Sequence, residues 1–219
     1  MSNRILILLA LCGLAASASA QSNFNRFNFT VGAGPGIGRG DVAGYVGNSF
    51  QGTVGGGVNF SRMFGADAEY MYYDLGFRPG VIQQQSLPGQ SGNMQSVSLN
   101  MIVHAPLHGK WGAYGIFGGG FYHRSVSATS QFLPFLLPCQ PAWRWWDLNC
   151  GVNGVIANPQ GETLSSNSKD AGGFNYGGGL TYRLNHLYNS KLFIEWRYHR
   201  AYHSDGQTIV MPVTIGLRW

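Results

Sequence analysis

The chain has 219 residues, which is long enough for one domain with a substantial core. Only 11% of the residues are charged, whereas a soluble domain usually carries about 25%, and beyond the N-terminus no apolar run approaches the ~18 residues that a membrane helix needs. The net charge of +5 is spread without a cluster of lysine or arginine, so no nucleic-acid partner is expected. The remaining way to cross a bilayer with every backbone group bonded is a closed β-barrel.

Residues 1–20 have the composition of a secretory signal peptide. An apolar stretch follows the single basic residue Arg4, and small residues lead up to Ala20. This order predicts cleavage after Ala20, which leaves residues 21–219 as the barrel domain. The alternatives are a buried helix, which would have no cap here, and a lipoprotein signal at Cys12, whose preceding residue is larger than that signal requires.

Apolar and polar residues alternate with a period of two along most of the mature chain, which predicts β-strands. The alternating segments cover residues 27–33, 50–60, 64–72, 97–103, 174–182, 192–198 and 208–219. A further segment, residues 111–126, is so rich in glycine and aromatic residues that the alternation does not reveal its inward face. Together these segments predict an all-β fold, a closed antiparallel up-and-down transmembrane β-barrel of about eight strands.

The connections between these segments alternate in length. The short ones lie near residue 62, at 106–109 and at 185–190, and the long ones at 37–47, 76–93 and 127–169. Such alternation predicts short turns on one side of the membrane and long loops on the other, with the short turns and both termini in the periplasm. The connection from His203 to Gln207 is the short exception on the side of the long loops.

The C-terminal sequence MPVTIGLRW alternates up to its last residue and ends on an aromatic side chain. Together with the signal peptide, the other strands and the stretch FIEWRYHR, it resembles the small bacterial outer-membrane β-barrel proteins, the group that includes OmpX and the transmembrane domain of OmpA. The resemblance implies an outer-membrane location, with contacts to membrane lipid and lipopolysaccharide. It also implies a signal read by the barrel-assembly machinery, which corresponds here to Val213, Ile215, Leu217 and Trp219. Pro212 departs from the pattern because it removes a backbone donor from the strand that must close the barrel.

A barrel of about eight strands is only wide enough for side chains to fill its interior. The alternation directs charged side chains of both signs into that interior, namely Asp67, Glu69, Arg183, Glu195, Arg197, His199 and Arg218. Because lone charges in a narrow interior are costly, we expect them to pair as a salt-bridged plug. The alternative is a gated conductance that uses the same residues. Inward glycines such as Gly177 and Gly179 either leave a narrow cavity or make room for the long arginines.

The loop at residues 127–169 has the most distinctive composition. Cys139 and Cys150 are expected to form a disulfide, because the protein is exported. The tryptophans between them are Trp143, Trp145 and Trp146. Large apolar patches in exposed loops often contact a partner, so an extracellular partner is one interpretation. The other is a loop that packs on its own small core or rests at the lipid interface, where tryptophan is favoured.

Lipid A-modifying enzymes occur on this scaffold, and the segment HRAYHSD over residues 199–205 is the candidate for such activity. The deacylases use a His-x-Ser pair on one strand face, but Ala201 stands two residues after His199. His203 and Ser204 are adjacent and project to opposite faces, so these histidines are expected to contact headgroups or loops. The sequence therefore predicts no enzyme, no cofactor and no metal site. It favours a structural or surface-binding envelope protein, with a narrow channel as the alternative and a lipid A-modifying enzyme as the most distant one.

Overall fold

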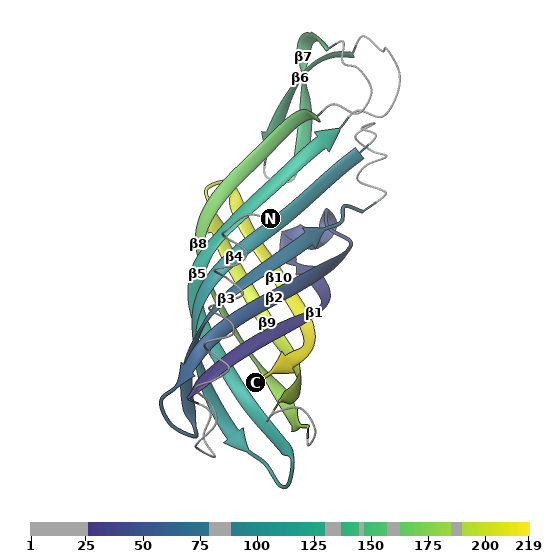
Figure 1. Cartoon of the computed structure of the whole chain (residues 1–219). Coiled ribbons are helices and arrows are strands. Elements are labelled where there is room, and N and C mark those ends of the chain that lie inside the picture. The colour runs from purple at the N-terminus through teal and green to yellow at the C-terminus, as the bar shows by residue number, and fades with distance from the viewer. Residues whose placement is uncertain (1–25, 79–88, 130–136, 145–146, 157–162, 185–189) are drawn as a thin grey trace, which may run out of the picture.

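The computed structural model describes residues 26–78, 89–129, 137–144, 147–156, 163–184 and 190–219, and these form one β-barrel with a projecting hairpin (Figure 1). The barrel strands are β1 (Phe27–Arg39), β2 (Asn48–Asn59), β3 (Phe64–Leu75), β4 (Gly89–Pro106), β5 (Trp111–Thr129), β8 (Thr163–Arg183), β9 (Lys191–His203) and β10 (Gly206–Arg218). The hairpin consists of β6 (Leu137–Arg144) and β7 (Asp147–Ile156), which pair only with each other. In the described part of the chain, no helix has the length and apolar character needed to cross a membrane.

The eight barrel strands close into a ring in the order β1-β10-β9-β8-β5-β4-β3-β2. Every neighbouring pair is antiparallel, and β1 closes the ring against β10 with Val31 opposite Leu217. The predicted closed antiparallel barrel of about eight strands is therefore confirmed. Pairing of β10 with β9 pauses at Met211 and Pro212 and resumes in the same register, so the missing donor is absorbed locally. On the other side, Pro212 stays opposite Gly36 of β1, and pairing pauses at Val213 and Thr214.

The period-two alternation seen in the sequence is what separates the two faces of the barrel wall. In β3, Asp67, Glu69 and Met71 are buried inside, whereas Tyr70 and Tyr72 are exposed on the outer face. The same division holds in β9, whose odd-numbered members from 193 to 203 are buried. The outer face is therefore apolar and aromatic, and the interior is largely polar.

The inward face of β5, which the sequence did not reveal, is set by the even-numbered residues. Tyr114, Tyr122 and Arg124 are buried, and Phe117 and Phe121 are exposed on the outer face. The glycines at 118 and 120 share the inward parity, where a Cβ would meet the backbone of β4. The strand therefore brings two tyrosines and an arginine into the interior.

The two ends of the barrel differ in their connections. At the short-turn end lie the β2–β3, β4–β5 and β8–β9 connections, and at the long-loop end lie the connections after β1, β3, β5 and β9. Three neighbouring strands, β4, β5 and β8, have 18, 19 and 21 residues, compared with 12 or 13 in the other five. They continue beyond the rim at the long-loop end, next to the hairpin (Figure 1). Strand structure thus continues into the expected loop at 127–169, because β5 extends to Thr129 and β8 begins at Thr163.

The interior at the long-loop end contains an apolar cluster beside its buried polar side chains, and the connection after β1 packs on this cluster. The sequence predicted a long connection over 37–47, and within it residues Gly40–Gly44 form a short 3-10 helix, η1. Val42 and Val46 are fully or almost fully buried and join a cluster that contains Met71, Tyr73 and Met94. A bridge between Val46 and Phe77, outside the named strands, fixes the segment to the rim. Apolar packing therefore holds this segment against the mouth of the barrel.

Candidate functional site

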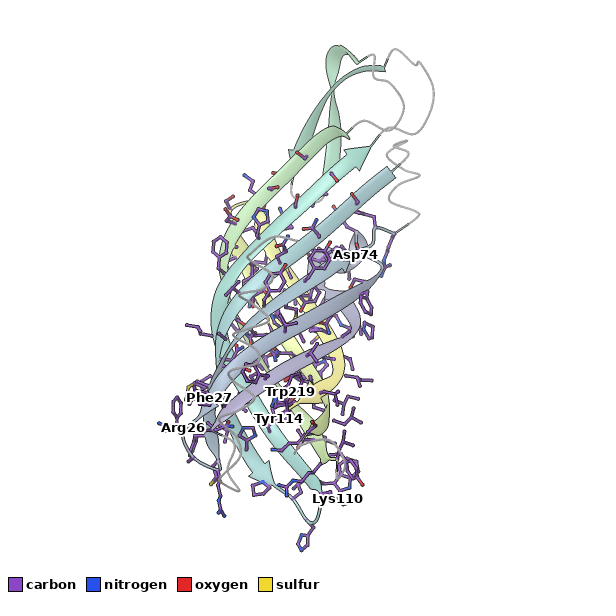
Figure 2. The ribbon with its side chains drawn as sticks, in the orientation of Figure 1. Arg26, Phe27, Asp74, Lys110, Tyr114 and Trp219 are labelled. Atoms are coloured by element: carbon purple, nitrogen blue, oxygen red, sulfur yellow. The ribbon has the colours of Figure 1, made fainter. Side chains whose placement is uncertain are left out.

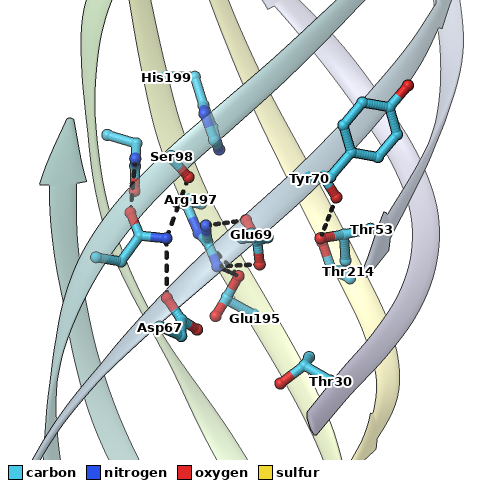
Figure 3. A network of polar contacts seen from close by, with 12 residues as sticks. Thr30, Thr53, Asp67, Glu69, Tyr70, Ser98, Glu195, Arg197, His199 and Thr214 are labelled. Atoms are coloured by element: carbon cyan, nitrogen blue, oxygen red, sulfur yellow. Dashed lines mark hydrogen bonds and ion pairs between the residues drawn. The ribbon is translucent and has the colours of Figure 1, made fainter. Parts of the chain in front are cut away.

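The centre of the interior holds an ion-pair cluster that crosses the barrel (Figure 3). Arg197 of β9 lies between Glu69 of β3 and Glu195, two residues away on the same face of β9. Its Nε donates to Glu195 Oε1 at 2.9 Å, one terminal nitrogen donates to Glu69 Oε2 at 3.1 Å, and the other pairs with Glu69 Oε1. Because β3 and β9 are four places apart in the ring of eight strands, this contact spans its diameter.

Neutral donors from other strands complete the cluster. Tyr114 of β5 donates its hydroxyl to Glu195 Oε2 at 2.8 Å. Asn100 of β4 donates to Asp67 Oδ1 at 3.0 Å and accepts from Asn175 of β8 at 2.9 Å. The carboxylate of Asp67 is thus held by an amide, while the two glutamates share one arginine. Five neighbouring strands of the ring, from β3 to β9, contribute side chains to this layer.

The inward glycines of β8 adjoin this cluster. Gly177 is directly opposite Arg197 and Gly179 is directly opposite Glu195. A Cβ at Gly179 would lie 2.7 Å from the hydroxyl oxygen of Tyr114, and a Cβ at Gly177 would lie 2.7 Å from Cα of Arg197. Of the two roles considered for these glycines, the structure supports making room for the large polar side chains.

Above this layer, toward the long-loop end, two histidines lie among buried partners. His199 is 1% exposed, its Nδ1 lies 3.0 Å from the hydroxyl of Tyr122, and its ring packs edge-on against Tyr73. His203 is also buried, with Nδ1 3.3 Å from the hydroxyl of Thr208. The expectation that these histidines contact headgroups or loops is therefore wrong, because both project into the barrel.

An ion pair lies close to the turn between β9 and β10. The Arg124 guanidinium donates to Asp205 Oδ2 at 2.7 Å, which ties β5 to this turn across the interior. Neither residue was among the predicted interior charges. A signal was available in the sequence: a charged side chain on a membrane-crossing strand is costly on the lipid face, so Arg124 alone would have assigned the even-numbered residues of β5 to the interior.

The predicted interior charges divide into two groups. The structure buries Asp67, Glu69, Glu195, Arg197, His199 and Arg218. Arg183 departs from the expectation, because it is the last residue of β8 and is exposed at the rim of the short-turn end. Its parity is inward, but the barrel wall ends at this level and leaves the side chain accessible to solvent.

The C-terminal strand presents the residues predicted as an assembly signal on the outer face. Val213, Ile215, Leu217 and Trp219 share that face, and Ile215 and Trp219 are exposed there. Backbone hydrogen bonds in both directions join Trp219 to Phe29, at 2.8 and 3.0 Å. The labelled Trp219 and Phe27 both lie toward the short-turn end of the barrel (Figure 2). These residues therefore form part of the seam between the first and last strands.

The hairpin carries Cys139 and Cys150. Cys139 of β6 is opposite Val152, and Cys150 of β7 is opposite Pro141. The side chains of these strands, including that of Trp143, lie outside the described part of the structure, as do Trp145 and Trp146 altogether. The disulfide and the tryptophan contacts stay predictions, as does the signal peptide.

The segment considered for lipid A chemistry has no nucleophile beside its histidines on the inward face, over residues 199–205, all of which are described. Ala201 lies on that face between His199 and His203, and Ser204 is exposed in the turn. Over the described residues, no group of three or more His, Cys, Asp or Glu side chains could hold a metal ion.

A closed barrel with an apolar outer wall, a polar interior and short turns at one end is the architecture of an outer-membrane β-barrel protein. In agreement, a family model described as the outer membrane protein beta-barrel domain matches residues 6–218. The chain belongs to this family.

Solved structures of outer-membrane proteins share the fold. Neisserial surface protein A (NspA) has a TM-score of 0.54 at 11% sequence identity, over 88% of this chain and 95% of that one. A major outer membrane protein from Thermus thermophilus has a TM-score of 0.52 at 13% identity, over 88% and 98%. Ail, the attachment invasion locus protein of Yersinia pestis, has a TM-score of 0.46 at 16% identity, over 88% and 97%. A search of curated protein sequences gave no match.

Proposed function

We propose that this protein is a non-enzymatic component of the outer membrane whose barrel is closed and whose surface at the long-loop end binds a partner outside the cell. One observation carries the proposal: β4, β5 and β8 continue past the rim and stand beside the β6–β7 hairpin (Figure 1). A barrel that only spanned the membrane would not need strands of 18 to 21 residues, since about 9–11 residues span the bilayer.

The proposal includes an orientation. The long-loop end would face the exterior and the short-turn end the periplasm, as in related barrels. The terminal strand with Val213, Ile215, Leu217 and Trp219 would be presented to the barrel-assembly machinery, and the outer face would contact membrane lipid and lipopolysaccharide. An envelope-stabilising role is compatible with the same arrangement, because a barrel with a filled interior can reinforce the membrane without making it permeable.

The test is removal of the hairpin. Cells that lack the gene are complemented with the wild-type protein, with a variant in which residues 137–156 are replaced by a short Gly-Ser linker, or with empty vector. We expect the hairpin variant to insert and to keep its heat-dependent electrophoretic mobility, because the barrel strands pair with one another and not with the hairpin. We expect its adhesion to epithelial cell layers to fall at least tenfold.

Resistance of the same cells to detergent is the matched readout for the envelope role. Equal adhesion with and without the hairpin would overturn the binding proposal. If, in addition, only the cells with empty vector lost detergent resistance, the result would support the structural role as the function.

A narrow channel is the second candidate, and a specific observation favours it. Buried polar atoms without a hydrogen-bond partner among the described residues lie around the central cluster, including Asp67 Oδ2 and Asn175 Oδ1. Such groups are usually satisfied by internal water. A continuous chain of water molecules through the interior would allow small solutes or ions to pass.

Planar-bilayer recording separates the two candidates. We expect the wild-type barrel to be silent, because Arg197, Glu69 and Glu195 cross the interior in one layer. Reproducible openings of the wild type that change in Glu195→Gln or Arg197→Gln would instead establish a gated conductance. An Arg62→Gln variant, altered in the exposed β2–β3 turn, is the matched control.

A further inference from the structure

A row of basic residues crosses three neighbouring strands at the short-turn end. Arg183 of β8 is directly opposite Lys191 of β9, and Lys191 is directly opposite Arg218 of β10. The backbone of Lys110 extends the row, because its carbonyl accepts from the amide of Arg183 at 2.9 Å. Directly paired residues project to the same face of a sheet, and like charges in such pairs are destabilising. The row is therefore an unfavourable arrangement on its own.

The surroundings of the row add positive charge. Lys191 is half-buried, and the charged groups that act on it are Arg183 and Arg218. His104 of β4 lies near the same mouth, where its charged neighbours are again Arg218 and Lys191. No carboxylate side chain stands in the row. Asp67 interacts electrostatically with Arg218, but its carboxylate is already bonded to Asn100.

Arg218 is the deepest member of the row and has unused donors. It is 4% exposed, its Nε donates to Thr30 at 3.1 Å, and its guanidinium lies over the ring of Tyr114 at 4.5 Å. Both of its terminal nitrogens lack a hydrogen-bond partner among the described residues. A buried guanidinium with two unused donors is costly unless an anion or water satisfies it.

The described acidic side chains outside the central cluster lie elsewhere. Asp41 is in η1, Asp74 is near the end of β3, Asp170 is in the upper part of β8, and Asp205 is in the β9–β10 turn, all toward the long-loop end. The cations at the short-turn end are thus not matched by acidic side chains on the described neighbouring turns. Over the described residues, none of Arg183, Lys191 and Arg218 forms an ion pair with an acidic side chain.

We propose that the row Arg183–Lys191–Arg218 is a binding site for a phosphate group at the short-turn mouth of the barrel. Neighbouring strands are about 4.8 Å apart, so three long basic side chains can reach one tetrahedral anion from three directions. Guanidinium groups contact phosphate oxygens in pairs, and a lysine supplies a compact charge beside them. The phosphate would belong to an anionic phospholipid headgroup of the adjacent leaflet or to free inorganic phosphate. This proposal does not depend on the role of the hairpin or on conductance.

The test uses the whole barrel in an uncharged maltoside detergent at low ionic strength, with inorganic phosphate titrated by calorimetry. We expect the Kd to rise at least tenfold in Lys191→Gln and in Arg183→Gln. The matched control Arg62→Gln removes the same charge from an exposed turn at the same end, and its Kd should change less than twofold. Heat-dependent mobility verifies that each variant is folded. If Arg218→Gln fails to fold, the other two variants decide.

Two further measurements sharpen the result. Native mass spectrometry of barrels extracted from phosphatidylglycerol and from phosphatidylcholine bilayers distinguishes the sources: selective retention of phosphatidylglycerol, lost in Lys191→Gln, identifies a lipid headgroup. Binding of inorganic phosphate without lipid retention identifies the free anion.

In phosphate-free buffer, Lys191→Gln should unfold at a higher temperature than the wild type, because the substitution relieves like-charge repulsion. Added phosphate should remove this difference in unfolding temperature. Wild-type protein that binds neither ligand, or variants that bind as tightly as the wild type, would overturn the proposal.

Discussion

An Arg197→Met variant is expected to have a free energy of unfolding about 3–5 kcal/mol below that of the wild-type barrel. Methionine fills part of the space of the arginine but leaves Glu69 and Glu195, each at most 3% exposed, without their shared cation. Two uncompensated carboxylates in a narrow interior repel each other and have no water shell. Urea unfolding in lipid vesicles, followed by tryptophan fluorescence and heat-dependent mobility, measures the loss.

Two companion variants isolate the electrostatic cause. The triple variant Arg197→Met, Glu69→Gln, Glu195→Gln should recover most of the stability, because no unpaired charge remains. Arg200→Met, on the same strand but bonded to Gln207 at the surface, should change the free energy of unfolding by less than about 0.5 kcal/mol. Wild-type stability in Arg197→Met would mean that the cluster does not hold the barrel together.

Gly177→Val is expected to lower the free energy of unfolding by about 1–3 kcal/mol, the usual cost of overpacking an interior. A Cβ at this position would meet the backbone oxygen of Trp196 and lie 2.7 Å from Cα of Arg197, so the displaced atoms belong to the neighbouring strand. The same unfolding assay applies, and a fraction that does not insert would appear as a band without heat-dependent mobility.

Gly172 provides the matched control for this prediction. It lies on the same strand, it is exposed, and a Cβ there would have nothing within 4 Å. Gly172→Val should therefore leave stability unchanged or raise it slightly, since valine favours strands. Equal losses in both variants would show that the cost comes from the β8 backbone and not from crowding against Arg197.

The architecture could be predicted from local sequence, because the alternation within each strand shows which residues face the interior and which face the lipid. Alternation alone placed Glu69, Glu195 and Arg197 in the interior, and all three are there. It failed in β5, where glycine and aromatic residues occupy both parities and only Arg124 distinguishes them. It also failed at the end of β8, because parity gives the direction of Arg183 but not the height at which the barrel wall ends.

Other features depended on contacts between distant residues and left little local trace. The pairing of Arg197 with Glu69 joins residues 128 positions apart, and which acid meets which base follows from the tilt and stagger of the strands. The burial of Val42 and Val46 depends on side chains from β3 and β4 that line the mouth. In isolation, a short stretch between two strands that contains glycine and aspartate has the composition of an open loop.

The extra length of β8 leaves part of its edge without a strand partner. Pairing with β9 begins only at Gly172, so over residues 163–171 no described strand continues the sheet on that side. An open edge of this kind is a template for pairing with another chain. Here the edge reads TLSSNSKDA, which is poor in strand-favouring residues and includes the charged residues Lys169 and Asp170, features that discourage such pairing. The sequence of this edge therefore disfavours strand addition. Neighbouring molecules of the protein in a crowded membrane can remain separate.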